Sequence, residues 1–252
     1  MSGAVVCDLD GVVYRGERAI AGSGEALEAL EEAGWTILFA TNNSARTPEH
    51  VVDKLRRLVG YEARTDQVVT SALVAASMIQ VGPVLVVAES GVEAAVTEAG
   101  FELTEDPDLA ATVVVGIDRA LTYDRIARAA EAIRRGAAFI ATNQDPTFPT
   151  EHGLLPGAGA CVAAVETASG VTGINAGKPS DAMRRLIEER CPPGTIWMIG
   201  DRPDTDLALA AWPRWRSILV LTGVTASAEG VSPAPDAVAE DLVRAVELVI
   251  ES

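Results

Sequence analysis

The chain has 252 residues, which is enough for one large domain or two modest ones. Of these residues 48% are hydrophobic, and the mean hydropathy is +0.21. These values are typical of a globular protein and not of a disordered chain. Its formal net charge of −16 argues against nucleic acid or an anionic membrane as the main partner. No apolar stretch approaches the ~20 residues of a membrane span, so we expect no membrane-embedded segment.

The first predicted element is a buried strand at residues 4–7 that ends in acidic side chains. Asp8 and Asp10 flank one leucine, and alternate residues of a strand point to the same side, so their carboxylates fall together. Gly11 then allows a turn where a side chain would crowd the site. Two such acids repel each other, and a divalent cation is the usual reason for the pair. The alternative is a strand end with two solvated aspartates.

A helix, a second strand and another helix follow. Residues 22–25 predict a helix start with Ser23 as the capping residue. Residues 36–40 predict an apolar strand that leads into the Thr-Asn-Asn-Ser segment at 41–44, and residues 47–49 predict the next helix start. This β-α-β-α rhythm predicts an α/β fold with a doubly wound parallel sheet of the Rossmann type, in which functional residues follow the carboxyl ends of strands.

The alternation of strands and helices continues to the end of the chain. The stretch 226–237 is rich in proline and alanine and predicts a loop. The further predicted strands are residues 84–88, 112–117, 138–141, 195–199 and 218–221, and the further predicted helices are residues 92–99, 123–135, 160–168, 180–190 and 207–211, with a last one from about residue 240.

Polar residues at the ends of these elements are expected to share one crevice of the sheet. Such a set suits phosphoryl transfer, in which positioning and charge neutralisation do nearly all the work. A carboxylate can attack phosphorus when a metal ion and a lysine screen the two anions from each other. The residues concerned are Asp8 and Asp10 after the first strand, Thr41 after the second, Lys178 before a helix, and Asp201 with Asp206 after a later strand.

Each of these residues also has a purely structural interpretation. Thr41 alone would be a turn hydroxyl, and Lys178 would be a solvated lysine, although a cation is unfavourable at a helix start. Asp206 would be the N-cap of the helix at 207–211. The prediction of chemistry therefore depends on the whole set and its order along the chain.

Four segments that span essentially the whole chain resemble the motifs of the haloacid dehalogenase superfamily. The resemblance is closest to its subfamily IIA, the branch of NagD-like, 4-nitrophenyl phosphate and phosphoglycolate or glycerol-3-phosphate phosphatases. The segments are Asp8-Leu9-Asp10-Gly11-Val12-Val13, Thr41-Asn42-Asn43-Ser44, Gly177-Lys178-Pro179-Ser180 and Gly200-Asp201-Arg202-Pro203-Asp204-Thr205-Asp206.

This resemblance implies a Mg²⁺-dependent phosphatase that hydrolyses a small phosphate monoester. Asp8 would be the nucleophile that forms an aspartyl phosphate, and Asp10 would be the general acid and then the base for water. Mg²⁺ would be bound by the Asp8 carboxylate, the Asp10 carbonyl and Asp201, with Asp206 in support. The remaining implied catalytic residues are Thr41, Asn42 and Lys178, and Asn43 is an implied substrate-binding residue.

The resemblance also implies two domains. The catalytic core would comprise residues 1–78 and 176–252, and residues 79–175 would form an inserted α/β cap, through which the chain could form a homodimer. Asn143 and Asp145 are cap candidates to bind the substrate, with a local turn as the alternative. Glu151 and His152 are expected to be exposed loop residues.

Three cysteines without a CxxC spacing argue against a disulfide framework or a zinc site. The N-terminus lacks the basic region of a secretory signal, so we predict a cytoplasmic protein. The expected partner is a small-molecule phosphate ester of the sugar phosphate, glycerol phosphate or phosphoglycolate type. The alternative functions are a phosphotransferase or phosphomutase, a receiver domain, and a catalytically silent phospho-ligand-binding protein on the same fold.

Overall fold

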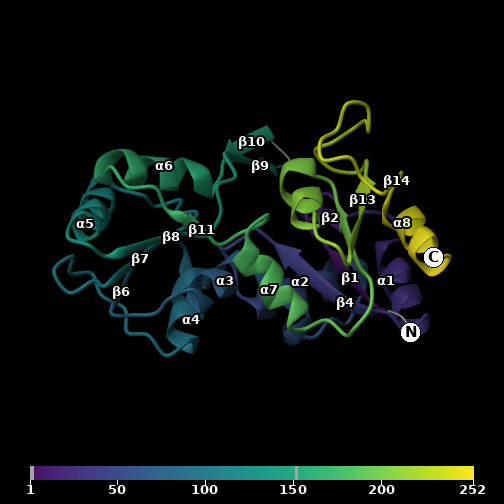
Figure 1. The fold of residues 1–252 in the computed structure, drawn as a ribbon, viewed down its shortest axis with the longest axis horizontal. Coiled ribbons are helices and arrows are strands. Elements are labelled where there is room, and N and C mark those ends of the chain that lie inside the picture. Colours follow the sequence, from purple (N-terminus) through teal and green to yellow (C-terminus); the bar gives the residue numbers. More distant parts are fainter. Residues whose placement is uncertain (1–2, 151–152) are drawn as a thin grey trace.

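Two parallel β-sheets lie side by side along the long axis of the molecule, in a computed structural model that describes residues 3–150 and 153–252 (Figure 1). The larger sheet has six strands in the order β14-β13-β12-β1-β4-β5, and every neighbouring pair is parallel. Its strands are β1 (Ala4–Cys7), β4 (Thr36–Thr41), β5 (Val68–Thr70), β12 (Ile196–Gly200), β13 (Trp215–Val220) and β14 (Ala237–Ala239).

Helices cover both faces of the six-stranded sheet, which explains why a central strand such as β1 is a continuous apolar run. In β1, Val5 and Cys7 pack into the cluster on one face, and Ala4 and Val6 pack into the cluster on the other. This doubly wound arrangement confirms the predicted fold class. The helices on the first face are α1 (Ser23–Glu32), α2 (Pro48–Val59) and α8 (Leu242–Ile250), and those on the second are α3 (Ser71–Ser77) and α7 (Asp181–Glu188).

The smaller sheet has four parallel strands in the order β11-β8-β7-β6. One of its faces packs against α5 and α6, and the other packs against α4. Its strands are β6 (Val84–Val87), β7 (Thr112–Val115), β8 (Ala138–Ala141) and β11 (Ile174–Asn175), and its helices are α4 (Ser90–Glu98), α5 (Tyr123–Arg134) and α6 (Ala158–Ser169).

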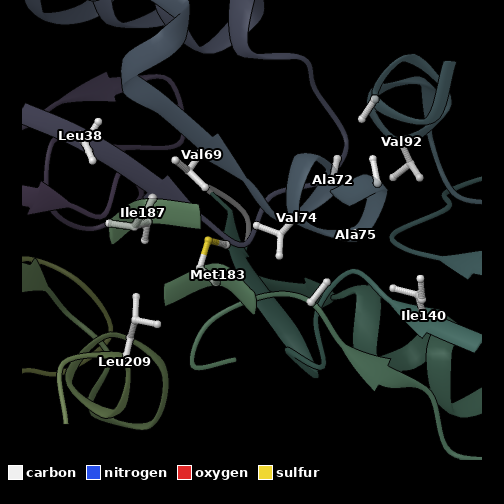
Figure 2. Close-up of a cluster of buried hydrophobic side chains, with 14 of the residues drawn as sticks. Leu38, Val69, Ala72, Val74, Ala75, Val92, Ile140, Met183, Ile187 and Leu209 are labelled. Carbon is white, nitrogen blue, oxygen red and sulfur yellow. The ribbon is translucent and has the colours of Figure 1, made fainter. Parts of the chain in front are cut away.

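One buried apolar cluster joins the two sheets. Figure 2 shows Leu38 and Val69 of the larger sheet, Val74 of α3, Met183 of α7 and Ile140 of the smaller sheet as members of this cluster. Because the hydrophobic effect scales with the apolar area that is removed from water, burial of these side chains stabilises both sheets together. The two sheets therefore share part of their core.

Two short antiparallel hairpins were not predicted from the sequence. The pair β2 (Tyr14–Arg15) and β3 (Arg18–Ala19) follows β1, and the pair β9 (Thr147–Thr150) and β10 (Gly153–Pro156) follows β8. Strands β2 and β3 have only two residues each, and β9 and β10 each contain a proline, which argues against a strand. Strands β5 and β11 and helix α3 were also not predicted, and the residues expected to be exposed in a loop, Glu151 and His152, lie outside the described residues.

Two local expectations are wrong, and a third, the loop, is confirmed except at its last residue. Ser23 does not cap α1, because its hydroxyl donates to the Ile20 carbonyl at 2.8 Å and Gly22, with φ of 77°, precedes the helix. The segment 207–211 is not a separate helix with Asp206 as its N-cap, because Pro203–Leu207 forms one π-helical turn that contains Asp206. The loop predicted at 226–237 ends in β14, whose first residue is Ala237.

Within residues 3–150 and 153–252, no helix is both long and apolar enough to cross a membrane.

Candidate active site

The ends of several strands meet at one cavity of about 730 Å³. Both sheets contribute, because the loops after β1, β4 and β12 of the larger sheet lie opposite the loops after β7 and β8 of the smaller one. This is where a doubly wound sheet is expected to bind ligands. All of the site residues predicted from the sequence line the cavity, namely Asp8, Asp10, Thr41, Asn42, Asn43, Asn143, Asp145, Lys178, Asp201 and Asp206.

Lys178 lies at the centre of the site, in the segment that precedes α7. Its Nζ is 2.6 Å from Asp8 Oδ1 and 2.7 Å from Asp206 Oδ1, and it donates to the Ala40 carbonyl at 2.9 Å. Burial alone would lower the pKa of Lys178, but the charges of Asp206 and Asp8 outweigh it and raise the pKa. The side chain is therefore a buried ammonium ion and not a solvated lysine.

Three buried carboxylates surround this ammonium. Asp8, Asp201 and Asp206 each offer an oxygen atom that lies within 4.8 Å of those of the other two. Burial raises the pKa of Asp8 well above its usual range, against the effect of Lys178. Burial, followed by the nearby Asp206 carboxylate, raises the pKa of Asp201 to about 6. The three acids outnumber the one ammonium, so the site has an excess of negative charge when all are ionised.

The donor set fits a Mg²⁺ ion. Asp201 Oδ2 accepts the Val224 N–H at 2.6 Å, but Asp201 Oδ1 is buried without a hydrogen-bond partner among the residues that the structure describes. A Cβ atom at Gly223 would lie 1.8 Å from Asp201 Oδ2, and one at Gly11 would lie 2.6 Å from it, so the two glycines leave the space for this carboxylate. Closely spaced carboxylate oxygens with excess negative charge are the environment that a hard divalent cation prefers.

Asp206 is held by the backbone at the end of β12. Its Oδ2 accepts the N–H groups of Asp201 at 3.1 Å and Arg202 at 3.0 Å, which leaves Oδ1 for Lys178. A Cβ atom at Gly200 would lie 2.2 Å from the Asp206 Cβ, so only glycine fits there. The wider π-helical turn brings this carboxylate back over the strand end, and such turns are frequent at functional sites.

Asp10 lies outside the group of three carboxylates. Its Oδ1 accepts the Gly16 N–H at 3.3 Å, and burial raises the pKa of Asp10, opposed mainly by Lys54. A raised carboxyl pKa suits a group that must donate a proton and take one back. The expectation that the Asp10 carbonyl binds the metal ion stays a prediction.

Thr41 and Asn43 form the turn after β4. Thr41 is buried, and its Oγ1 accepts the Asn43 N–H at 3.1 Å, so its hydroxyl proton remains available to another acceptor. Asn43 Oδ1 accepts the Ala45 N–H at 2.9 Å, and Asn43 itself is exposed and lines the cavity. The local turn and the site are thus built from the same groups.

Several cations of the cavity wall were not identified from the sequence. The chain contains only two lysines, Lys54 and Lys178, and both line this cavity. Lys54 Nζ is 3.9 Å from the centre of the Tyr14 ring and 3.6 Å from Glu17 Oε1. The scarcity of lysine could have identified Lys54 from the sequence. Lysine is usually common on a solvated surface, so a chain with only two lysines favours a specific role for each. The other cationic residues of the wall are Arg46, Arg57, Arg119 and Arg202.

Comparison with known proteins supports the expected family. The profile described as a haloacid dehalogenase-like hydrolase matches residues 5–102, and one described as HAD-hydrolase-like matches residues 175–245. The chain is 37% identical over 228 residues to an acid sugar phosphatase of Staphylococcus aureus, covering 88% of this chain and 87% of the relative.

Solved structures with the same fold include two phosphatases. The p-nitrophenyl phosphatase of Archaeoglobus fulgidus superposes with a TM-score of 0.90 at 30% identity, covering 98% of this chain and all of that one. The glycerol phosphate phosphatase of Mycobacterium tuberculosis, solved in complex with magnesium, superposes with a TM-score of 0.86 at 35% identity, covering 95% of this chain and 74% of that one. The family predicted from the four motifs is therefore confirmed.

Proposed function

This chain belongs to the haloacid dehalogenase-like hydrolase family, and on that premise we propose that it is a phosphatase that hydrolyses small phosphate monoesters at Asp8 with the help of Mg²⁺. The observation that carries this proposal is the placement of Lys178, whose ammonium lies between Asp8 and Asp206 beside a third buried acid, Asp201. This arrangement pairs one carboxylate with a fixed cation at the floor of a cavity, as nucleophilic attack on an anionic ester requires. The phosphatases among the relatives support the same reading.

In the first step, the Asp8 carboxylate forms a bond to phosphorus while the bond from phosphorus to the alcohol oxygen breaks. Asp10 donates its proton to the departing alkoxide, and the raised pKa of Asp10 favours the protonated form that this step needs. The Thr41 hydroxyl donates to a phosphoryl oxygen, and the Lys178 ammonium screens the charge of Asp8 from that of the phosphoryl group. Mg²⁺, when bound by Asp8 and Asp201 with Asp206 in support, would neutralise charge on the phosphoryl group.

In the second step, water attacks the phosphorus of the aspartyl phosphate. Asp10 takes a proton from this water, the bond from phosphorus to Asp8 breaks, and inorganic phosphate leaves. Asp8 is thereby restored as a carboxylate and Asp10 as an acid, so the cycle balances without another reactant. An alternative acceptor alcohol in place of water would make the same site a phosphotransferase.

We further propose that residues 79–175 act as a cap over the core formed by residues 1–78 and 176–252. The position of Asn143 and Asp145 in the cavity wall supports this division. Exposed Leu154, Leu155 and Ile174 on the inserted segment support a homodimer through the cap. Free cysteines, of which Cys7 and Cys161 are buried, support a cytoplasmic location.

The proposal is tested by phosphate release from a panel of sugar phosphates, glycerol phosphate, phosphoglycolate and p-nitrophenyl phosphate. Wild-type protein with Mg²⁺ should release phosphate, and either EDTA or the isosteric substitution Asp8→Asn should abolish the release. Equal background release by wild type and Asp8→Asn would contradict the phosphatase assignment. Tight, saturable ester binding without any release would instead favour the silent binding protein.

A further inference from the structure

Asn42 connects three segments that lie far apart in the sequence. Its Oδ1 accepts the Lys178 N–H at 2.7 Å, and its Nδ2 donates to the Lys178 carbonyl at 3.3 Å. The same Nδ2 donates to Asp145, at 3.1 Å to Oδ2 and 3.3 Å to Oδ1. This amide orientation follows from the chemistry of one partner, because the Lys178 backbone N–H can only donate and so must face the Asn42 oxygen.

These contacts use both donors of the Asn42 side chain. An amide NH₂ group has two hydrogens, and here one is directed to Asp145 and the other to the Lys178 carbonyl. No side-chain donor is then left for a phosphoryl oxygen. The Asn42 carbonyl is also occupied, by Asn143 Nδ2 at 2.6 Å and by the Ser71 hydroxyl at 2.7 Å. The side chain of Asn42 thus holds protein groups and not the substrate.

Asp145 is itself fixed by its surroundings. Its N–H donates to Asn143 Oδ1 at 3.1 Å, and its carbonyl accepts the Gly159 N–H at 2.9 Å, at the start of α6. A Cβ atom at Gly157 would lie 2.3 Å from the Asp145 carbonyl oxygen, so the glycine lets the chain pass close to it. The carboxylate therefore projects from the loop after β8 at a point where the backbone is hydrogen-bonded to Asn143 and to the start of α6.

The packing around Lys178 is equally close. A Cβ atom at Gly177 would lie 2.6 Å from Asn42 Oδ1 and 2.7 Å from the Thr142 carbonyl oxygen. The backbone that leads into Lys178 is therefore confined between the larger sheet and the loop after β8. Any displacement of Asn42 would therefore shift the Lys178 backbone. The Nζ atom of Lys178 would move with it, and this atom lies 2.6 Å from Asp8 Oδ1.

We propose that Asp145 is a positioning residue, which acts through the Asn42 amide to fix the Lys178 peptide and so the ammonium that faces the nucleophile. This inference rests on the proposed phosphatase function. It assigns to Asp145 a role in the reaction of every substrate, instead of the direct substrate contact that the sequence predicted. The role needs only a hydrogen-bond acceptor at position 145 and not a negative charge.

The test compares Asp145→Ala, Asp145→Asn and the control Asp204→Ala on two esters with unlike alcohol groups, glycerol 3-phosphate and p-nitrophenyl phosphate. Asp204 is an exposed acid that lies 3.5 Å from Arg202, so its removal takes one negative charge from the same region. Loss of the acceptor should lower kcat about 10- to 100-fold, equally for both esters and with little change in KM. Asp145→Asn should retain most of kcat, since its carboxamide oxygen can accept the same N–H, and Asp204→Ala should match wild type.

A double variant adds a readout that a general loss of structure would not give. If Asp145 acts only through Asn42, Asn42→Ala combined with Asp145→Ala should be no slower than Asn42→Ala alone. A loss that differs tenfold or more between the esters, or that falls on KM, would overturn the inference and make Asp145 a substrate contact. An unchanged kcat in Asp145→Ala would overturn this inference but not the proposed function. The absence of Mg²⁺-dependent phosphate release by the wild type would overturn both.

Discussion

At the scale of single residues, the site depends on the balance between one buried ammonium and three buried acids. Lys178 contacts Asp8 and Asp206 directly, and Asp201 completes the group. Removal of one partner from a buried set of charges leaves the others uncompensated in a medium of low polarity. The same charges that serve the chemistry therefore also decide the stability of the metal-free protein.

Lys178→Met should destabilise the metal-free protein strongly. Loss of the ammonium leaves three neighbouring carboxylates, and breaking a buried ion pair typically costs about 3–5 kcal/mol. Urea denaturation in EDTA measures the change in the free energy of unfolding. The matched control is Lys54→Met at the other lysine, which pairs with the exposed Glu17 and should lose no more than about 1 kcal/mol. Equal losses from both substitutions would contradict this account.

The raised pKa of Asp201 should make the metal-free protein more stable at pH 5 than at pH 7. The pKa is about 6 in the folded protein against an ordinary value of 3.8, so between these values the folded state holds a proton that the unfolded state has released. The free energy of unfolding should consequently rise as the pH falls from 7 to 5, by about 1 kcal/mol for this group.

Asp201→Asn provides the control for this pH dependence. The amide does not titrate, so the variant should lose this part of the difference between pH 5 and pH 7 in urea denaturation with EDTA. An unchanged pH dependence in Asp201→Asn would show that other groups produce it.

At the scale of elements, the strands and their order were predictable, but the contacts between loops were not. Buried parallel strands such as β1 and β4 are short apolar runs that end in polar residues, so both their existence and the meeting of their ends follow from the sequence. The contact between Asn42 and Asp145 joins residues 103 positions apart, and no local pattern specifies it. The π-helical turn at Pro203–Leu207 was not predicted, because an aspartate before an apolar run gives the same pattern as the N-cap of an ordinary helix.

The loop after β13 should control the metal site through Gly223. A methyl group there would lie 1.8 Å from Asp201 Oδ2, so Gly223→Ala must move this carboxylate or its own backbone. We expect Mg²⁺ affinity to fall about 10- to 100-fold, as for other groups that orient metal ligands, when measured by isothermal titration calorimetry.

Gly136→Ala is the matched control for Gly223→Ala. Gly136 has φ of +106° and open space around its Cβ position, so alanine there introduces backbone strain at a residue that does not line the cavity. It should lower thermal stability without changing Mg²⁺ affinity. A similar loss of affinity in both variants would mean that general destabilisation, and not displacement of Asp201, weakens binding.

At the scale of the whole molecule, the charge distribution is uneven in a way that favours an anionic substrate. The chain carries a net charge of −16 with only 20 lysine and arginine residues, yet six of these residues line the one cavity described above. A cavity wall with local cations can attract a phosphate ester that the average field of the protein would repel. The cluster shared by the two sheets keeps the opposite walls of this cavity in place.

The most direct test of the central claim is to trap the phosphoryl group on the protein during turnover. Acid quenching of wild-type protein with Mg²⁺ and a radiolabelled phosphate ester, followed by peptide mapping, should place the label on the peptide that contains Asp8, and Asp8→Asn should carry none. Release of phosphate by the wild type without any covalent label, or a label that persists in Asp8→Asn, would contradict the account of Asp8 as the nucleophile.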